Sequence, residues 1–489
     1  MFKKIGDVLN GRGYKLLALG LSLLFVFVNA CLISRDYQVL NLVPFVLVAS
    51  LLILFAPEKT FFLLVLLAPL SVPFSEFFPG LEFDFWFPTE PLLVTLLVLI
   101  LLKSLHDHYF DKALVNHPIF WAILFYLGWL VIATVSSEMP IVSVKYTLVR
   151  FWFIAVFFYF SYLQFVKAEK NFKKYIGLFL TGLFVIVLIS LNRQVARGLF
   201  DKYVAHGSCN PFFTDHTSYG AALALVIPVL IGFVFLAKRW WSRLLLLIAS
   251  LFFVSALILS YSRAAWLSLF VAGGVWVIWY LRIRFRTLII GGLLAVLLVF
   301  TFQEEIGRWL SYNQSTSSGN LQQHLNSVTN VKTDDSNVER LNRWTSAIRM
   351  FRERPFLGWG PGTYMFLYAP FQASYLKTIE SSDLGAKGNA HSEYLGLLAE
   401  AGILAPIGYV LILIIVLYRG FTLVRLYLDR DRRIIVLSVL LGLITYVVHG
   451  LLNNFLDMDK IAAIFWGYIA LVVAMDVKYR GLKKLESQN

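Results

Sequence analysis

Residues 244–281 read LLLLIASLFFVSALILSYSRAAWLSLFVAGGVWVIWYL, and Arg263 is the one charged residue among them. The apolar runs on either side of Arg263 each approach the roughly 20 residues that a helix needs to cross about 30 Å of hydrocarbon. Continuous runs of this kind favour helices over the shorter alternating strands of a β-barrel. The stretch therefore predicts two membrane-spanning helices joined by a short connection at Arg263.

The rest of the chain has the same character. Of its 489 residues, 59% are hydrophobic and 15% are charged, whereas soluble domains carry about 25% charged residues. We expect an all-α polytopic membrane protein with about 14 transmembrane helices, within a range of 12–14. The predicted spans are 16–33, 39–56, 60–76, 88–102, 118–136, 151–166, 175–191, 219–237, 244–261, 264–281, 287–302, 395–417, 434–452 and 461–476. Pro69 and Pro73 interrupt the third span, which predicts a half-span or a kinked helix.

The distribution of positive charge predicts the topology. Of the 43 Lys and Arg, 26 fall in segments on the same side as the N-terminus, and the short loops of the other side hold 8. This bias places both termini in the cytoplasm. The net charge of +14 is thus mostly a topology signal, and we expect no nucleic-acid partner. The first span has no cleavage signal after it and is expected to act as its own signal anchor.

Three parts follow from these assignments. Residues 1–302 form a transmembrane bundle of about 11 spans, residues 303–394 form one large outer loop with helical content, and residues 395–489 contain about three further spans. Within the loop, residues 311–337 are rich in Ser, Asn, Gln and Thr and are predicted to be flexible. The next segment, 339–354, predicts an amphipathic helix. Its expected apolar face consists of Leu341, Trp344, Ile348 and Phe351.

Outward-facing arginines are the first candidate functional groups. Arg150 is predicted to open the span at 151–166, and Arg263 lies between two spans with almost no loop. An arginine at the membrane boundary calls for a partner, because moving it toward the centre costs about 2.5 kcal/mol or more. Phosphate suits the guanidinium fork well. Snorkelling or a helix-end ion pair is the structural alternative for each single arginine.

The second signal is Asn389-Ala390-His391-Ser392-Glu393-Tyr394, where the outer loop re-enters a helix. Ser392 or Asn389 can cap that helix, and its N-terminal amides form an anion site. His391 is then a group that titrates near neutral pH beside this site. A structural histidine is the alternative. His216 is a second candidate in another outer loop, and His449 is expected in the core or in a cavity.

Other constellations are weaker. Residues 358–362, GWGPG, lack the context of a phosphate loop and predict a turn. The outer acids show no metal-ligand spacing, so we expect no metal; they are Glu82, Asp84, Asp334, Asp335, Asp457 and Asp459. Glu339 beside Arg340 predicts a local cap or ion pair. The two cysteines, Cys31 and Cys209, show no disulfide framework.

Taken together, these motifs resemble the superfamily of O-antigen ligases and O-antigen polymerases, bacterial enzymes of polysaccharide assembly. The resemblance covers about residues 250–410 and rests on SRAAW at 262–266, ERL at 339–341 with Trp344, RPFLGWGPG at 354–362, HSEYL at 391–395 and EAG at 400–402. The ligase pattern of His, then Asn, Ser or Gln, nine residues and Gly fits His391, Ser392 and Gly402. Its final Gly, Thr or Tyr is replaced by Ala405, a departure that weakens ligase relative to polymerase.

The resemblance implies a GT-C-like glycosyltransferase of the bacterial inner membrane with its active site facing the periplasm. The donor would be a glycan on undecaprenyl diphosphate, and neither metal nor cofactor would be required. By similarity, His391 would be the general base or would orient the acceptor hydroxyl. Arg263, Arg340 and Arg150 would bind the diphosphate, with His216, Asn389 and Glu339 as secondary candidates.

Three functions stay open. An O-antigen ligase would use the lipid A core oligosaccharide as acceptor, and a polymerase would use a second lipid-linked repeat unit. A transporter of lipid-linked sugars is the more distant alternative, because it would also use outward arginines and broken spans. The membrane lipid is a partner in every case, and the oligomeric state is not predicted.

Overall fold

The computed structural model describes residues 12–34, 44, 55–78, 85–107, 111–283, 287, 301, 335–378, 381, 388–426 and 429–486. The chain divides into two units, Met1–Phe61 and Phe62–Asn489. The first contains helix α2 (Arg12–Ile33), whose residues Leu19–Ile33 form a short apolar helix. The second contains all the candidate site residues.

Nine of the described helices are long and apolar enough to cross a membrane, which supports an all-α polytopic protein. They are α7 (Pro118–Val135), α8 (Pro140–Phe153) continued by a π-helical stretch (Ile154–Phe160) and α9 (Ser161–Lys167), α10 (Lys170–Arg197), α12 (His216–Leu236), α13 (Trp240–Leu259), α14 (Arg263–Tyr280), α21 (Leu404–Leu426), α22 (Arg430–His449) and α23 (Asp459–Glu486). The predicted spans 39–56 and 287–302 lie outside the described residues, apart from single positions.

The second unit also has shorter elements. They are α4 (Pro57–Leu67, which begins in the first unit), β1 (Val72–Pro73), a 3-10 turn (Phe74–Glu76), β2 (Trp86–Phe87), α5 (Thr89–Asp107), α6 (Lys112–Val115), α11 (Lys202–Ser208), α18 (Asp335–Glu353), α19 (Tyr364–Leu367), 3-10 turns at Ala369–Phe371 and Ser374–Leu376, and α20 (Glu393–Ala401). β1 and β2 pair antiparallel. The predicted span 60–76 ends as a helix at Leu67, before Pro69, so the expected break occurs.

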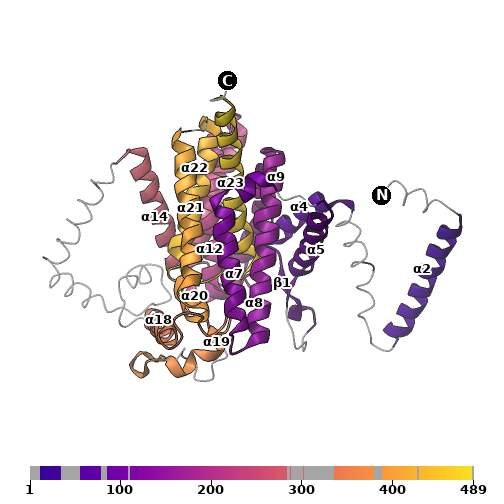
Figure 1. The fold of residues 1–489 in the computed structure, drawn as a ribbon, viewed down its shortest axis with the longest axis horizontal. Helices are drawn as coiled ribbons and strands as arrows, with labels where there is room; N and C mark the ends of the chain where they lie inside the picture. Colours follow the sequence, from indigo (N-terminus) through magenta and orange to yellow (C-terminus); the bar gives the residue numbers. More distant parts are fainter. Residues whose placement is uncertain are drawn as a thin grey trace. The chain divides into compact units, whose positions relative to one another are not determined.

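Helix α23 lies at the centre of the bundle. Figure 1 shows α7, α12, α21, α22 and α23 running side by side, and α23 packs against α9, α21 and α22. Its residues from 459 to 476 are all buried. The run Ile461–Met475 is apolar on every face, a composition that suits a helix packed against other helices on all sides.

Buried charges at both ends of the buried stretch of α23, residues 459–476, have partners. Lys460 Nζ contacts Ser71 Oγ at 2.6 Å and Asp459 Oδ1 at 3.2 Å. At the other end, His117 Nε2 lies 3.0 Å from Asp476 Oδ2. The Nδ1 of the same ring accepts from the Ile119 amide, so Nε2 carries the proton and donates to Asp476. These pairs satisfy charges that would otherwise be costly to bury.

One predicted helix start and one predicted unbroken helix are wrong. The span expected at 151 begins at Pro140, because Pro is favoured in the first turn of a helix. Arg150 therefore lies inside the helix and is 2% exposed, rather than opening it at the surface. The predicted span 395–417 is interrupted, because α20 ends at Ala401 and α21 begins at Leu404.

Gly402 causes the second break. Its φ is +70°, a conformation that favours glycine. A Cβ at this position would overlap the carbonyl oxygen of Phe356. The chain can turn here only because residue 402 has no side chain, so α20 and α21 are separate helices.

We expect Gly402→Ala to lower the thermal-unfolding midpoint of the purified full-length protein by several degrees, because the overlap adds to a left-handed strain of about 1–2 kcal/mol. Gly177→Ala is the matched control, since nothing lies within 4 Å of its Cβ position in α10. Ala is favoured over Gly in a helix by about 0.5–1 kcal/mol, so the control should be neutral or stabilising. Equal midpoints for the two variants would contradict this account.

Candidate functional site

Helix α18 buries a polar face. The buried residues are Asn342, Arg343, Ser346, Ala347 and Met350, together with Glu339 at the start of the helix. The predicted apolar face is only half-buried at Leu341, Trp344 and Phe351, and Ile348 is exposed. The prediction of a helix is confirmed, but the prediction of its buried face is wrong. Polar residues can take the buried side because they satisfy one another's hydrogen bonds.

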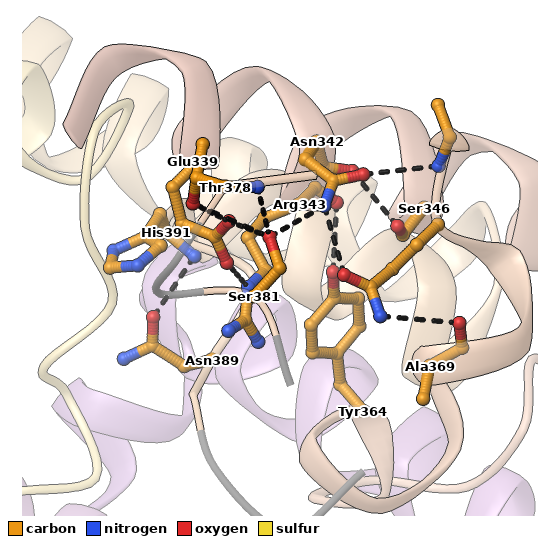
Figure 2. A network of polar contacts seen from close by, with 12 residues as sticks. Glu339, Asn342, Arg343, Ser346, Tyr364, Ala369, Thr378, Ser381, Asn389 and His391 are labelled. Carbon is orange, nitrogen blue, oxygen red and sulfur yellow. Dashed lines mark hydrogen bonds and ion pairs between the residues drawn. The ribbon is translucent and has the colours of Figure 1, made fainter. Parts of the chain in front are cut away.

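Figure 2 shows this network, whose centre is Glu339. Arg343 Nε lies 2.6 Å from Glu339 Oε1, one helical turn away, and Ser381 Oγ donates to Glu339 Oε2 at 2.6 Å. Asn342 donates to Gln372 Oε1 at 2.9 Å. The expected local ion pair of Glu339 thus forms, and Arg343 is a partner in it. The network connects α18 to the loop that follows it.

His391 lies in a strained loop beside α18. Its φ is +48°, which is uncommon for a residue with a side chain. The backbone on both sides is held in place: Asn389 Oδ1 accepts from the His391 amide at 3.0 Å, and Trp344 Nε1 donates to the His391 carbonyl at 3.1 Å. Figure 2 shows the contact with Asn389. These two hydrogen bonds hold the His391 backbone in its strained conformation. Strained residues fixed by their surroundings in this way are common at functional sites.

The ring of His391 has polar and charged neighbours. Its Nδ1 is buried and has no hydrogen-bond partner among the described residues. The Asn453 side chain interacts with the same ring and also lies 3.2 Å from His449 Nε2. Burial and, to a smaller extent, the nearby positive charges of Arg340 and Arg343 together lower the pKa of His391 from 6.5 to about 4. The imidazole is therefore neutral at physiological pH.

Ser392 and Glu393 begin helix α20 directly after this loop. Ser392 is the N-cap, with its side chain accepting from the Leu395 amide, so the predicted cap is confirmed. Glu393 Oε1 accepts from Tyr446 OH at 2.6 Å and from the amides of Phe455 and Leu456 at 2.8 Å. The Glu393 amide donates to the Gly450 carbonyl. These bonds join the start of α20 to the end of α22.

Arg150 approaches the same carboxylate from α8. Its Nη2 lies 3.7 Å from Glu393 Oε2 and donates to Tyr146 OH at 2.8 Å. Two further donors of the guanidinium, Nε and Nη1, are buried without a hydrogen-bond partner among the described residues. Arg150 is therefore connected to His391 through Glu393, two residues along the chain. Its two unpaired donors could serve an anionic oxygen.

Residues 358–362 form the predicted turn, and it packs against the end of α20. Gly358, Gly360 and Gly362 all have positive φ. The Gly360 amide donates to the Glu400 carbonyl at 2.8 Å, and Glu400 Oε1 accepts from the Tyr364 amide at 3.0 Å. Burial raises the pKa of Glu400 to about 7. The turn therefore supports the helix that carries the site and does not form an anion loop.

The remaining predicted residues lie at the starts of neighbouring helices. Arg263 is the first residue of α14 and is half-buried. His216 is the first residue of α12, and its ring stacks on His206 with centroids 3.7 Å apart. Asp215, the N-cap of α12, is close enough to His391 to oppose the lowering of its pKa. The start of α12 therefore lies within electrostatic reach of His391.

The part of the chain that the structure describes contains no group of three or more His, Cys, Asp or Glu able to hold a metal ion. Of the predicted outer acids, Asp459 belongs to the buried network with Lys460, while Glu82, Asp84 and Asp334 lie outside the described residues. Metal independence stays a prediction.

Several residues of this site were not among the predicted candidates. They are Glu393, Glu400, Tyr446, His449 and Asn453. Glu393 and Glu400 could have been found from their places in the motifs around His391. Asn453 and Tyr446 carry no such signal, because they come from a helix end and a connection that approach His391 only in the folded chain.

Residues 248–410 match the family model described as O-antigen ligase. The matched stretch includes Arg263, Arg340, Asn389 and His391, and it excludes Arg150 and His216. No curated protein matches the chain. The match confirms the resemblance to the O-antigen ligase and polymerase superfamily, and with the nine apolar helices it indicates a multi-pass membrane protein.

We expect the lowered pKa of His391 to appear as a pH-dependent loss of stability. The unfolded state binds a proton below about pH 6.5, and the folded state does so only near pH 4. The contribution of His391 is therefore complete above pH 6.5 and is lost as the pH falls toward 4. The measurement is the thermal-unfolding midpoint of wild type and of His391→Asn between pH 4 and 7.

The difference in midpoint between wild type and His391→Asn reports on the imidazole alone, because Asn also tolerates the left-handed backbone of residue 391. The thermal-unfolding midpoint of wild type should fall further than that of His391→Asn as the pH is lowered. Parallel curves over the whole range would show that His391 is not held in its neutral form.

Proposed function

We propose that this chain, with its O-antigen ligase match at residues 248–410, is a glycosyltransferase that moves a glycan from undecaprenyl diphosphate to an acceptor hydroxyl on the periplasmic face of the inner membrane. The match supports activity of the O-antigen ligase or polymerase type. The observation that carries the reaction is the buried, unpaired Nδ1 of a neutral His391, held in a defined loop with arginines nearby.

In the proposed reaction, the acceptor hydroxyl attacks the anomeric carbon of the donor. A carbon–oxygen bond to the acceptor forms, the bond to the diphosphate breaks, and the diphosphate leaves with the electron pair. His391 Nδ1 takes the hydroxyl proton as a general base, or orients the hydroxyl through the same atom. General bases in such positions contribute about 10²–10⁴-fold to the rate.

Binding of the glycan donor would change the pKa of His391 through electrostatic interactions. Arg340 and Arg343 lower the pKa of His391 in the free site. An anionic diphosphate beside the arginines would offset their charge and raise the pKa again. His391 would thus become a stronger base when the donor is bound and stay neutral while the site is empty.

Arg263, Arg340 and Arg150 are proposed to bind the diphosphate and to stabilise the negative charge that grows on it. Arg150 is supported by its two buried and unpaired donors. Arg340 is supported by its electrostatic effect on His391. Asn389 and Glu339 are proposed to position the site, Asn389 through the His391 amide and Glu339 through Arg343. His216 remains a secondary candidate at the start of α12.

The acceptor distinguishes the two forms of the proposal. A ligase would use the lipid A core oligosaccharide, and a polymerase would use a second lipid-linked repeat unit. The presence of Ala405, where the ligase pattern has Gly, Thr or Tyr, favours the polymerase. We keep the ligase as the first reading because the matched family is described as O-antigen ligase.

We expect His391→Asn to reduce glycan transfer by about 10²–10⁴-fold while the protein still inserts and purifies normally. Asn keeps the left-handed backbone accessible but cannot accept the proton as imidazole does. The assay follows the mass of the glycan product after reconstitution with an undecaprenyl-diphosphate glycan. Near-normal transfer by this variant would overturn the role of His391.

Arg263→Gln and Arg340→Gln should each reduce transfer at least about tenfold, since each removes a charged hydrogen bond to the leaving group. Arg352→Gln is the matched control, because Arg352 is exposed on the same helix as Arg340. The control should keep wild-type transfer, and a loss equal to that of Arg340→Gln would show that general charge on α18 is responsible.

The same reconstitution assigns the acceptor. A ligase forms glycosylated lipid A core only when the core is supplied, whereas a polymerase lengthens the donor glycan without it. Donor that crosses the bilayer unchanged, with no new product in either arm, would instead support a transporter of lipid-linked sugars.

A further inference from the structure

A second site with ligand-binding features lies at the other end of the bundle. A cavity of about 1600 Å³ lies between the ends of α14 and α21 and the start of α22. Both α14 and α21 pack on α22. Along α22, Arg433 is separated from His449 by about 24 Å of helix at 1.5 Å per residue. The cavity is therefore distinct from the His391 site.

Three arginines from three elements converge on this cavity. Arg282 follows α14, Arg425 lies in the last turn of α21, and Arg433 lies in the first turn of α22. The described lining of the cavity contains no acidic residue. Arg282 and Arg425 form no ion pair within the described parts of the chain. Arg282 and Arg425 thus bring positive charge to the cavity that no described carboxylate pairs with.

The remaining walls are apolar and aromatic. Trp279 and Phe421 line the cavity, and Tyr280 and Tyr418 at its edge are 66% and 69% exposed. Aromatic residues in such positions are typical of the membrane interface. The volume exceeds the roughly 300–1,000 Å³ of pockets for drug-sized ligands. The combination suits a molecule with an anionic head and long apolar chains.

Topology alone does not explain the arrangement. Arginines gather at the cytoplasmic ends of membrane helices in general, but they need not surround a common cavity. Here the charges come from separate elements and face one apolar space. Basic pockets between helices on the cytoplasmic side are a recognised setting for acidic lipid headgroups.

We propose that this cavity binds an anionic phospholipid of the leaflet at that end of the bundle. By the distribution of Lys and Arg, this is the cytoplasmic leaflet. The phosphate interacts with Arg282, Arg425 and Arg433, and the acyl chains lie against the aromatic wall. The lipid is separate from the reacting donor, so the proposal does not depend on which glycan the protein transfers.

The test compares lipid retention by the full-length protein. Wild type and the triple variant Arg282→Gln/Arg425→Gln/Arg433→Gln are purified, incubated with phosphatidylglycerol or with phosphatidylcholine, and washed. The lipid bound per protein is then measured by mass spectrometry. We expect wild type to retain phosphatidylglycerol in preference to phosphatidylcholine, and the triple variant to lose that preference with at least a fivefold drop in retained phosphatidylglycerol, about 1 kcal/mol.

Two controls make the result specific. The variant Lys103→Gln/Lys112→Gln/Lys170→Gln removes three exposed charges from the same predicted side outside the cavity, and it should retain phosphatidylglycerol as wild type does. The variant with all three cavity arginines changed to Lys keeps the charge and should retain most of the lipid, even if the Gln variant folds poorly.

Three outcomes would overturn the proposal. Equal retention of phosphatidylglycerol by wild type and a folded triple Gln variant would show that the three arginines do not bind the lipid. Equal loss in the Lys control would indicate general surface charge. Equal retention of phosphatidylcholine by wild type would show that the cavity takes acyl chains without recognising an anionic head.

Discussion

The candidate site depends on the hydrogen bonds and the ion pair of the buried Glu393 carboxylate. This carboxylate accepts three hydrogen bonds from Tyr446, Phe455 and Leu456, and it faces Arg150 on α8. A buried carboxylate without such partners would be strongly destabilising, and removing one member of a buried pair costs about 3–5 kcal/mol. The start of α20 therefore has one stable position relative to α8 and α22. His391 lies two residues earlier and takes its position from the same contacts.

Helix α18 defines the other side of the His391 loop. Trp344 donates to the His391 carbonyl, and the Glu339–Arg343 pair connects the helix to Ser381. The guanidinium of Arg343 occupies the space that a side chain at Gly388 would need. Because polar groups from distant segments satisfy one another here, a loop with a strained residue can stay ordered. This rigidity suits a group that must meet a substrate in one geometry.

Much of the architecture follows from residue composition. Apolar length predicted the helices, Pro69 predicted the break after α4, and Ser392 predicted the cap of α20. Arg150 shows where this reasoning fails, since the helix begins at Pro140 and carries the arginine into the interior. Helix α18 shows a second failure, because periodicity identifies an amphipathic helix but not which face is buried. A face of Glu, Asn, Arg and Ser becomes interior only when partners from residues 364–381 complete its hydrogen bonds.

The sequence by itself determined the all-α membrane class, the approximate helices and the identity of the motif that contains His391. These features depend on local composition and on residues near one another in the chain. The tertiary structure alone decided that Arg150 meets Glu393, that Asn453 lies beside His391, and that three arginines surround one cavity at the far end of α22. Such contacts join residues from different helices and loops, in one case more than 200 positions apart, and only the packing of helices brings those residues within reach of one another.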